Sequence, residues 1–110
     1  HVMDIANAHT KSLQYLMAGK NKESVEVFNL GSGEGVTVLE LISAFERISG
    51  RKLNFQIGPR RAGDVVAVYA DNQKARKQLG WSPAYGLDQM MGTAWKWEQK
   101  LQLDEQMHLN

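Results

Sequence analysis

Residues 25–50 read V-E-V-F-N-L-G-S-G-E-G-V-T-V-L-E-L-I-S-A-F-E-R-I-S-G, and this stretch decides the expected fold. Its first five residues indicate a short strand. Thr37, followed three residues later by Glu40, forms a capping box, which predicts a helix from about Val38 to Ser49. Gly50 is the natural residue to end that helix. A strand, a glycine-rich turn and a helix in succession are typical of an α/β fold.

The rest of the chain adds elements of similar length. Asp4 is a suitable N-cap for the first helix. Further helices are expected at 5–17, 71–79 and 87–101, and strands at 25–29, 53–57 and 65–70. We therefore expect a small α/β domain over residues 1–101, with too few strands for a full dinucleotide-binding sheet. A frayed tail is expected at 102–110.

Length and composition restrict the class of protein. A chain of 110 residues with 43% hydrophobic and 23% charged residues fits one globular domain. The net charge of +1 lacks the basic excess of nucleic-acid-binding domains, so no nucleic-acid partner is expected. No apolar run approaches the roughly 20 residues of a membrane helix, so no membrane partner is expected. The absence of cysteine excludes a disulfide scaffold and a thiol nucleophile, and it fits the reducing cytoplasm, where we expect the protein.

The glycine loop Gly31-x-Gly33-x-Gly35 resembles a phosphate cradle between a strand and a helix. Its details argue against that role, because Val36 occupies the place of the third glycine in the dinucleotide fingerprint. Glu34 adds a negative charge that would repel a phosphate. We therefore interpret the loop as a strand-to-helix turn in which glycine permits positive φ.

The segment P-R-R-A-G-D at 59–64 is the second candidate site. The planar guanidinium of an arginine suits phosphate oxygens, and an aspartate accepts hydrogen bonds from hydroxyls such as those of a ribose. Gly63 lets the backbone turn closely between the two groups. The alternative is a surface loop in which the Arg and the Asp pair with each other, worth about 0–1 kcal/mol. Local physics alone favours this alternative.

A metal site or a catalytic pair is not expected. The histidines at positions 1, 9 and 108 lack the spacing of metal ligands or of a catalytic triad. The carboxylates are mostly expected at helix caps or in solvent, and no two of them suggest an acid–base couple. We predict no catalytic residue and no metal ligand in this chain.

Six short motifs together carry a resemblance to a known family. In order, they are H-V-M-D at 1–4, N-L-G-S-G at 29–33, P-R-R-A-G-D at 59–64, A-D-N-Q-K-A at 70–75, L-G-W at 79–81 and W-K-W at 95–97. Each motif is weak alone, but their order and spacing are specific. The chain resembles, over residues 1–101, the carboxy-terminal part of the UDP-glucose 4-epimerase family, which are extended short-chain dehydrogenases/reductases.

The resemblance assigns roles to three residues. It implies that Arg61 contacts the UDP diphosphate and that Asp64 contacts the ribose, which reverses the local preference for a self-paired loop. It also implies that Val68, four residues after Asp64, lies near the sugar ring. Because Val68 is small, we hypothesise that the parent enzyme also accepts UDP-N-acetylhexosamines.

The resemblance also implies what this chain lacks. The family's NAD-binding glycine fingerprint is absent, and so is its Tyr-x-x-x-Lys pair, since the residues four after the three tyrosines are Gly19, Gln73 and Gln89. The parent is expected to be an NAD-dependent isomerase that interconverts UDP-glucose and UDP-galactose. It is expected to form a homodimer through a region upstream of this chain. This chain alone is expected to lack the Rossmann sheet, bind no cofactor, be inactive, and bind UDP-sugars only weakly.

Two alternatives remain open. The first is a fragment of a related nucleotide-sugar dehydratase or decarboxylase, against which the clean P-R-R-x-G-D motif argues. The second is a stand-alone, non-catalytic binding module. The chain begins at His1 directly in a helical pattern, which indicates a boundary inside a larger fold. Residues 1–20 are then a helix from the junction with the NAD domain, and this argues against the module.

Overall fold

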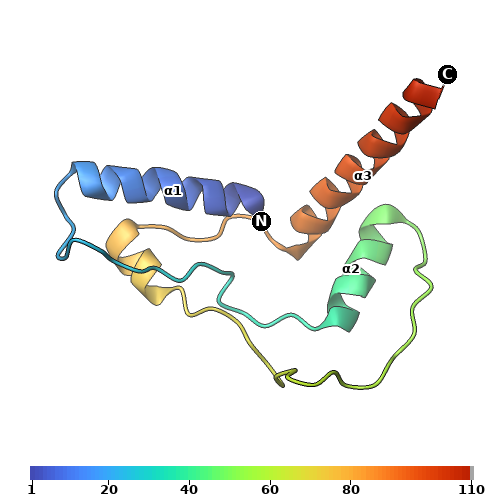
Figure 1. The fold of residues 1–110 in the computed structure, drawn as a ribbon, viewed down its shortest axis with the longest axis horizontal. Helices are drawn as coiled ribbons and strands as arrows, with labels where there is room; N and C mark the ends of the chain where they lie inside the picture. Colours follow the sequence, from blue (N-terminus) through green and yellow to red (C-terminus); the bar gives the residue numbers. More distant parts are fainter. Residues whose placement is uncertain (110) are drawn as a thin grey trace. The chain divides into compact units, whose positions relative to one another are not determined.

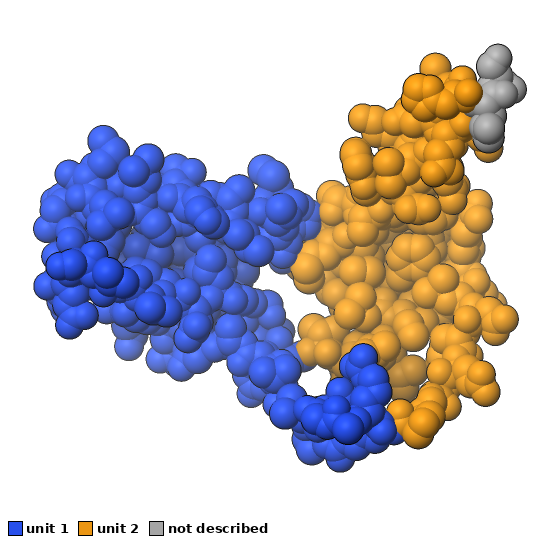
Figure 2. Space-filling view, viewed as in Figure 1, with its two compact units in different colours: residues 1–35, 60–85 blue, residues 36–59, 86–110 orange. Residues whose placement is uncertain are grey.

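The computed structural model describes residues 1–109, whose elements are helical (Figure 1). They are α1 (Val2–Met17), α2 (Val38–Ser49), the short π-helical turn η1 (Ala75–Leu79) and α3 (Leu87–Leu109). The chain forms two compact units (Figure 2). Unit 1 contains residues 1–35 and 60–85, and unit 2 contains residues 36–59 and those from 86 onward.

The three predicted strands are wrong. Residues 25–29, 53–57 and 65–70 are irregular, and the described part of the chain contains no strand, so the α/β class is not realised. The physical reason is that a strand needs a neighbour whose backbone completes the hydrogen-bond ladder. β-branched residues mark a segment as suited to a strand, but they do not provide that neighbour. The prediction that the chain lacks a Rossmann sheet agrees with this helical architecture.

The core of unit 1 joins α1 to η1 and to the bend that follows. Trp81 is its largest fully buried side chain, with 1% of its surface exposed. The remaining members are residues of α1 and η1, with two partly buried residues packed against them: Ala8, Tyr15, Ala75 and Leu79, then Phe28 and Leu30. The core is therefore assembled from segments distant in sequence.

The start of α1 differs from the prediction. The helix begins at Val2, and the ring nitrogen Nδ1 of His1 accepts a hydrogen bond of 3.0 Å from the amide of Met3. Asp4 lies inside the helix and is only 4% exposed. Its carboxylate accepts hydrogen bonds from the amides of Ala84 (2.8 Å) and Tyr85 (3.2 Å). Asp4 thus binds the bend after Trp81 and does not cap the helix.

The expected ends of α2 are confirmed. The Thr37 hydroxyl accepts a hydrogen bond of 3.1 Å from the amide of Glu40, which satisfies one of the unpaired donors of the first turn. At the other end Gly50 adopts the left-handed conformation with φ of 71°. Both ends are set by local sequence.

Unit 2 is a helical pair of α2 and α3. The rings of Phe45 and Trp95 meet edge to face with centroids 5.5 Å apart, and the guanidinium of Arg51 lies 5.1 Å from the Trp95 ring centroid. Arg47 forms an ion pair with Asp88 on the exposed side of the pair. Aromatic contacts therefore hold the two helices together.

Two helix boundaries need correction. α3 continues to Leu109, so the prediction of a frayed tail at 102–110 is wrong over the residues described, and Asn110 lies outside them. Residues 102–109 contain neither glycine nor proline, and most are adequate helix formers. The helix predicted at 71–79 is shorter. Asp71 accepts a hydrogen bond of 3.0 Å from the amide of Gln73, and Gly80 ends η1 with φ of 66°.

Candidate functional site

The turn Arg61–Asp64 is closed by its own hydrogen bonds. The carbonyl of Arg61 accepts from the amide of Asp64 at 3.3 Å, and the Asp64 carboxylate accepts from the amide of Arg61 at 3.1 Å. Gly63, the third residue of the turn, has φ of 85°, a value that favours glycine at this position. The sequence P-R-R-A-G-D therefore builds a tight turn that fixes the spacing between one arginine and one aspartate.

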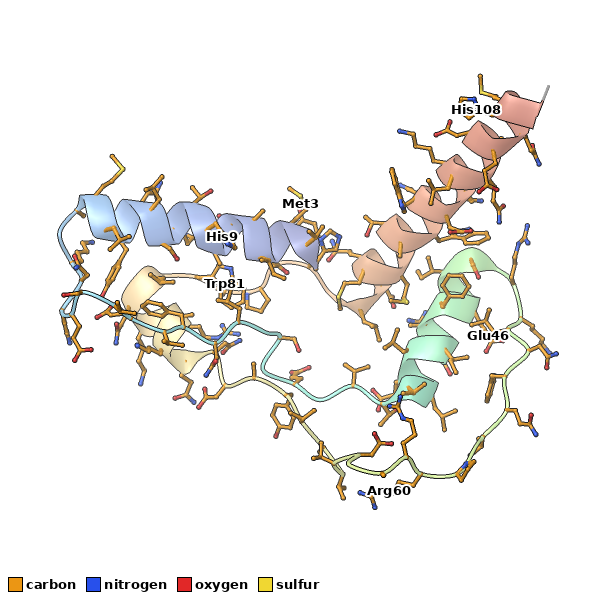
Figure 3. All side chains as sticks on the ribbon, viewed as in Figure 1. Met3, His9, Glu46, Arg60, Trp81 and His108 are labelled. Carbon is orange, nitrogen blue, oxygen red and sulfur yellow. The ribbon has the colours of Figure 1, made fainter. Side chains whose placement is uncertain are left out.

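The side chains of Arg61 and Asp64 also pair with each other. Nε of Arg61 donates to Oδ2 of Asp64 at 3.3 Å, while the two side chains are 86% and 36% exposed. The neighbouring Arg60 (labelled in Figure 3) donates from Nη2 to the carbonyl of Asp64 at 3.2 Å. An exposed pair of this kind contributes about 0–1 kcal/mol, so a ligand could replace it at little cost.

Val68 lies further along the same irregular segment and is 83% exposed. The structure thus places all three predicted site residues on one exposed stretch, 61–68. It brings Arg61 and Asp64 into contact with each other. No described contact joins Val68 to either of them.

The glycine loop packs against the segment that follows this stretch. A Cβ atom on Gly31 would lie 2.8 Å from Cβ of Ala70, and one on Gly35 would lie 3.3 Å from the ring of Tyr69. Gly33 has φ of 80°, as expected for a turn. The three glycines therefore permit close approach of two protein segments. The glycines serve this packing, and Glu34 adds a negative charge to the loop, so the loop does not fit the pyrophosphate of a dinucleotide.

Asn72 completes this contact and was missed in the sequence. It is 4% exposed, and its Nδ2 donates to the carbonyl of Gly31 at 2.8 Å. Its Oδ1 accepts from Nε of Arg76 at 2.8 Å. Buried polar side chains are almost always hydrogen-bonded, and here both ends of the amide have a partner. The only signal in the sequence was an amide placed directly before a helix.

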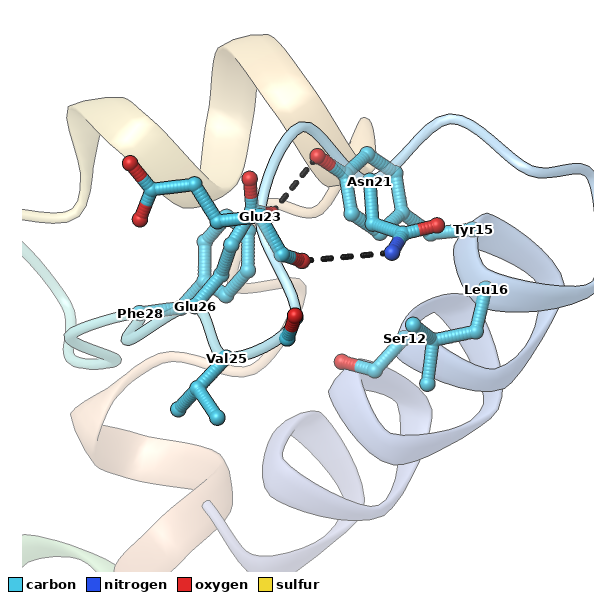
Figure 4. Close-up of a pocket in the computed structure, with 9 residues that line it drawn as sticks. Ser12, Tyr15, Leu16, Asn21, Glu23, Val25, Glu26 and Phe28 are labelled. Atoms are coloured by element: carbon cyan, nitrogen blue, oxygen red, sulfur yellow. Dashed lines mark hydrogen bonds between the residues drawn. The ribbon is translucent and has the colours of Figure 1, made fainter.

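A second feature that the sequence did not reveal is a cavity of about 300 Å³ between α1 and residues 21–28 (Figure 4). At its wall the Tyr15 hydroxyl donates to Oε2 of Glu26 at 2.7 Å, and Oε1 of Glu26 accepts from the amide of Lys22 at 3.2 Å. The bond to Tyr15 lowers the pKa of Glu26 despite the opposing effect of burial. The same bond raises the pKa of Tyr15. The pair joins two segments of unit 1.

Residues 1–109 show no sign of a metal site or a membrane-spanning segment. In that range no three His, Cys, Asp or Glu side chains are grouped so that they could hold a metal ion. None of the described helices has the length and apolar character needed to cross a membrane. The turn at 61–64 and its continuation to Val68 therefore remain the candidate site.

Comparison with known proteins gives a consistent result. The sequence profile of the GDP-mannose 4,6 dehydratase family matches residues 1–94. A bifunctional UDP-glucose 4-epimerase and UDP-xylose 4-epimerase of Arabidopsis thaliana is 47% identical over 100 residues, which are 91% of this chain and 28% of that protein. The UDP-glucose 4-epimerase of Erwinia amylovora is 45% identical over 98 residues, 89% of this chain and 28% of the relative.

A solved structure agrees with these relatives. The crystal structure of UDP-glucose 4-epimerase from Bifidobacterium longum, in complex with NAD+ and UDP, superposes with a TM-score of 0.80 at 41% identity. The superposition covers 91% of this chain and 29% of that one. The chain therefore spans less than a third of the length of the proteins that it matches.

Proposed function

This chain belongs to the GDP-mannose 4,6 dehydratase family. Because its relatives within that family are UDP-glucose 4-epimerases, we propose that it is the substrate-binding part of such an enzyme. The resemblance predicted from its six motifs is confirmed by epimerases that are 38–47% identical over about nine-tenths of its length. The proposed parent interconverts UDP-glucose and UDP-galactose with NAD. It is a cytoplasmic homodimer whose dimer contacts lie outside this chain.

One observation carries the proposal: the turn at 61–64 holds an exposed guanidinium beside a carboxylate at a fixed spacing. We assign Arg61 to the diphosphate of UDP and Asp64 to the ribose hydroxyls. A guanidinium binds phosphate oxygens through charge-assisted hydrogen bonds, and a carboxylate accepts from hydroxyls. We assign Val68 to the neighbourhood of the sugar ring, as the family resemblance implies.

The chain by itself should bind weakly and catalyse nothing. A hydrogen bond to a charged group contributes about 1.5–3 kcal/mol. Association costs at least about 4 kcal/mol, so two such contacts barely offset it. We expect dissociation constants in the millimolar range or weaker. The glycine loop packs against residues 69–72 and carries the negative charge of Glu34, so we expect this chain to supply substrate contacts and no cofactor chemistry.

A dehydratase of the same family is the second candidate, because the matching profile is described by that activity. Its description names a GDP-sugar, whereas the epimerase relatives are described by UDP-sugars. The choice between GDP and UDP therefore separates the two candidates. A non-catalytic interaction module would ignore both nucleotides.

The test is an amide NMR titration of this chain with UDP, with GDP and ADP as controls. We expect weak, UDP-selective shifts confined to residues 60–68 and their neighbours. A preference for GDP would favour the dehydratase. Shifts centred on residues 31–35 would move the site to the glycine loop, and no response up to the solubility limit of UDP would contradict binding by this chain.

The small Val68 supports a narrower proposal, that the parent accepts UDP-N-acetylhexosamines. A tyrosine at this position would occupy the space that an N-acetyl group needs. The experiment compares the parent with its Val68→Tyr variant on an N-acetylated substrate. Turnover by the parent and its loss in the variant are expected, whereas equal failure of both would contradict the proposal.

A further inference from the structure

We propose that Asn72 is a positioning residue for the substrate segment, residues 61–68. Its side chain anchors the backbone that follows Val68 to the glycine loop. The inference rests on the proposed function, since it concerns where that function places the sugar. It also assigns a role to the glycine loop, a motif that the substrate contacts of Arg61 and Asp64 leave unexplained.

The first line of evidence is the pattern of bonds around the buried amide. Asn72 donates to the carbonyl of Gly31 at 2.8 Å and accepts from Nε of Arg76 at 2.8 Å. It therefore connects the glycine loop to η1 through a single side chain. Because the amide is 4% exposed, water cannot easily take over either bond.

The second line of evidence is the close approach of the two segments. The ideal Cβ positions of Gly31, Gly33 and Gly35 lie 2.8–3.3 Å from Ala70, Asn72 and Tyr69 respectively. Any side chain at these glycines would displace its neighbour. The backbone of the loop therefore lies close to residues 69, 70 and 72 with no space for side chains between them, and Tyr69 is the residue next to Val68.

The third line of evidence is an asymmetry within the substrate segment. The Arg61–Asp64 turn is closed by hydrogen bonds among its own residues and does not depend on Asn72. Val68 is 83% exposed and precedes the first residue that the loop contacts. Disturbing Asn72 should therefore change the position of Val68 and leave the diphosphate and ribose contacts unchanged.

The test uses the Asn72→Asp variant, in which an oxygen replaces the group that donates to Gly31 while the acceptor for Arg76 remains. The unaltered chain and the variant are titrated with UDP and with UDP-glucose. We expect unchanged UDP affinity at the amides of Arg61 and Asp64. We also expect loss of the additional shift that UDP-glucose, relative to UDP, causes at the Val68 amide.

Two further variants make the result decisive. Gly35→Ala disturbs the Tyr69 ring from the other side of the contact. It should also remove the additional shift that UDP-glucose causes at the Val68 amide, and it provides this test if Asn72→Asp fails to fold. Asn54→Asp makes the same chemical change at an exposed asparagine in unit 2 and should behave like the unaltered chain.

Three results would overturn the proposal. Equal weakening of UDP and UDP-glucose would mean that Asn72 only supports the fold. An unchanged Val68 response in both Asn72→Asp and Gly35→Ala would mean that the loop does not position it. No response of the unaltered chain to UDP would contradict the proposed function itself, and that failure is seen before any variant is made.

Discussion

The indole nitrogen of Trp81 donates a hydrogen bond of 2.8 Å to the backbone carbonyl of Asp4, 77 residues earlier in the chain. The Asp4 carboxylate in turn accepts from the amides of Ala84 and Tyr85. Both groups of Asp4 therefore bind the bend that follows η1. These three hydrogen bonds join α1 to residues 81–85, the last residues of unit 1.

Replacing Asp4 by alanine should destabilise unit 1 by about 1–3 kcal/mol, because the Ala84 and Tyr85 amides lose their acceptor in a partly buried site. The loss is measured by urea unfolding of the chain. Asp104→Ala is the control, since Asp104 is exposed on α3 and alanine favours a helix. Equal midpoints for Asp4→Ala and the unaltered chain would contradict the assignment.

Replacing Gly31 by alanine should cost about 1–3 kcal/mol, because its Cβ would lie 2.8 Å from that of Ala70. Adding Ala70→Gly to this variant should restore part of the loss by removing the opposing atom. Gly58→Ala is the control, since no atom lies within 4 Å of its Cβ position. Urea midpoints of the four proteins test the contact, and absence of rescue by Ala70→Gly would argue against it.

Replacing Tyr15 by phenylalanine should lower the stability of unit 1 at neutral pH, because Glu26 loses its hydroxyl donor. The Tyr15 bond lowers the pKa of Glu26 in the folded chain, so its stabilisation is present above the ordinary value of 4.5 and is lost as the pH falls below it. The same bond raises the pKa of Tyr15, so this stabilisation is present below 10.0 and is lost as the pH rises through the raised value.

Thermal midpoints of the unaltered chain and Tyr15→Phe, measured from pH 3 to pH 11, test this linkage. The difference between them should be greatest between the two ordinary pKa values and should shrink toward both extremes. Tyr69→Phe is a matched control, because no hydrogen bond of the Tyr69 hydroxyl is described. A difference that does not depend on pH would contradict the role of the Tyr15–Glu26 pair.

Replacing Thr37 by alanine should destabilise α2 by about 1 kcal/mol, since the amide of Glu40 loses the hydroxyl that caps it. Hydrogen exchange at the first turn of α2 measures the effect directly. Thr37→Ser keeps the acceptor and should exchange almost as slowly as the unaltered chain. Equal exchange in the Ala and Ser variants would show that the cap contributes nothing.

Arg61→Ala should weaken UDP binding about tenfold or more, because it removes a charge-assisted contact with the diphosphate. It should leave the affinity for uridine, which has no phosphate, unchanged. Asp64→Asn should weaken the binding of both UDP and uridine, because both contain the ribose that Asp64 is proposed to contact. NMR titration measures the affinities, and Lys52→Ala controls for loss of one positive charge. Equal weakening of UDP and uridine by Arg61→Ala would contradict its assignment to the diphosphate.

Local sequence predicted the parts of the fold that local interactions form. Thr37 and Gly50 set the two ends of α2, because a cap acts within three or four residues of itself. Gly63 likewise supplies the positive φ of the turn at 61–64. The predicted tail at 102–110 was wrong over the residues described, because no residue there signals the end of a helix. Helix-forming residues continue α3 to Leu109.

The motifs by themselves determined the family, because their order and spacing can be recognised without the fold. Through that family they also pointed to Arg61, Asp64 and Val68 as site residues. Only the tertiary structure decided that residues 25–29, 53–57 and 65–70 form no strands, because pairing depends on distant partners. It also decided that Asp4 binds the bend at 84–85 and that Asn72 holds the glycine loop. A buried polar side chain is satisfied by whichever group the fold brings to it, and its own sequence neighbours do not reveal that group.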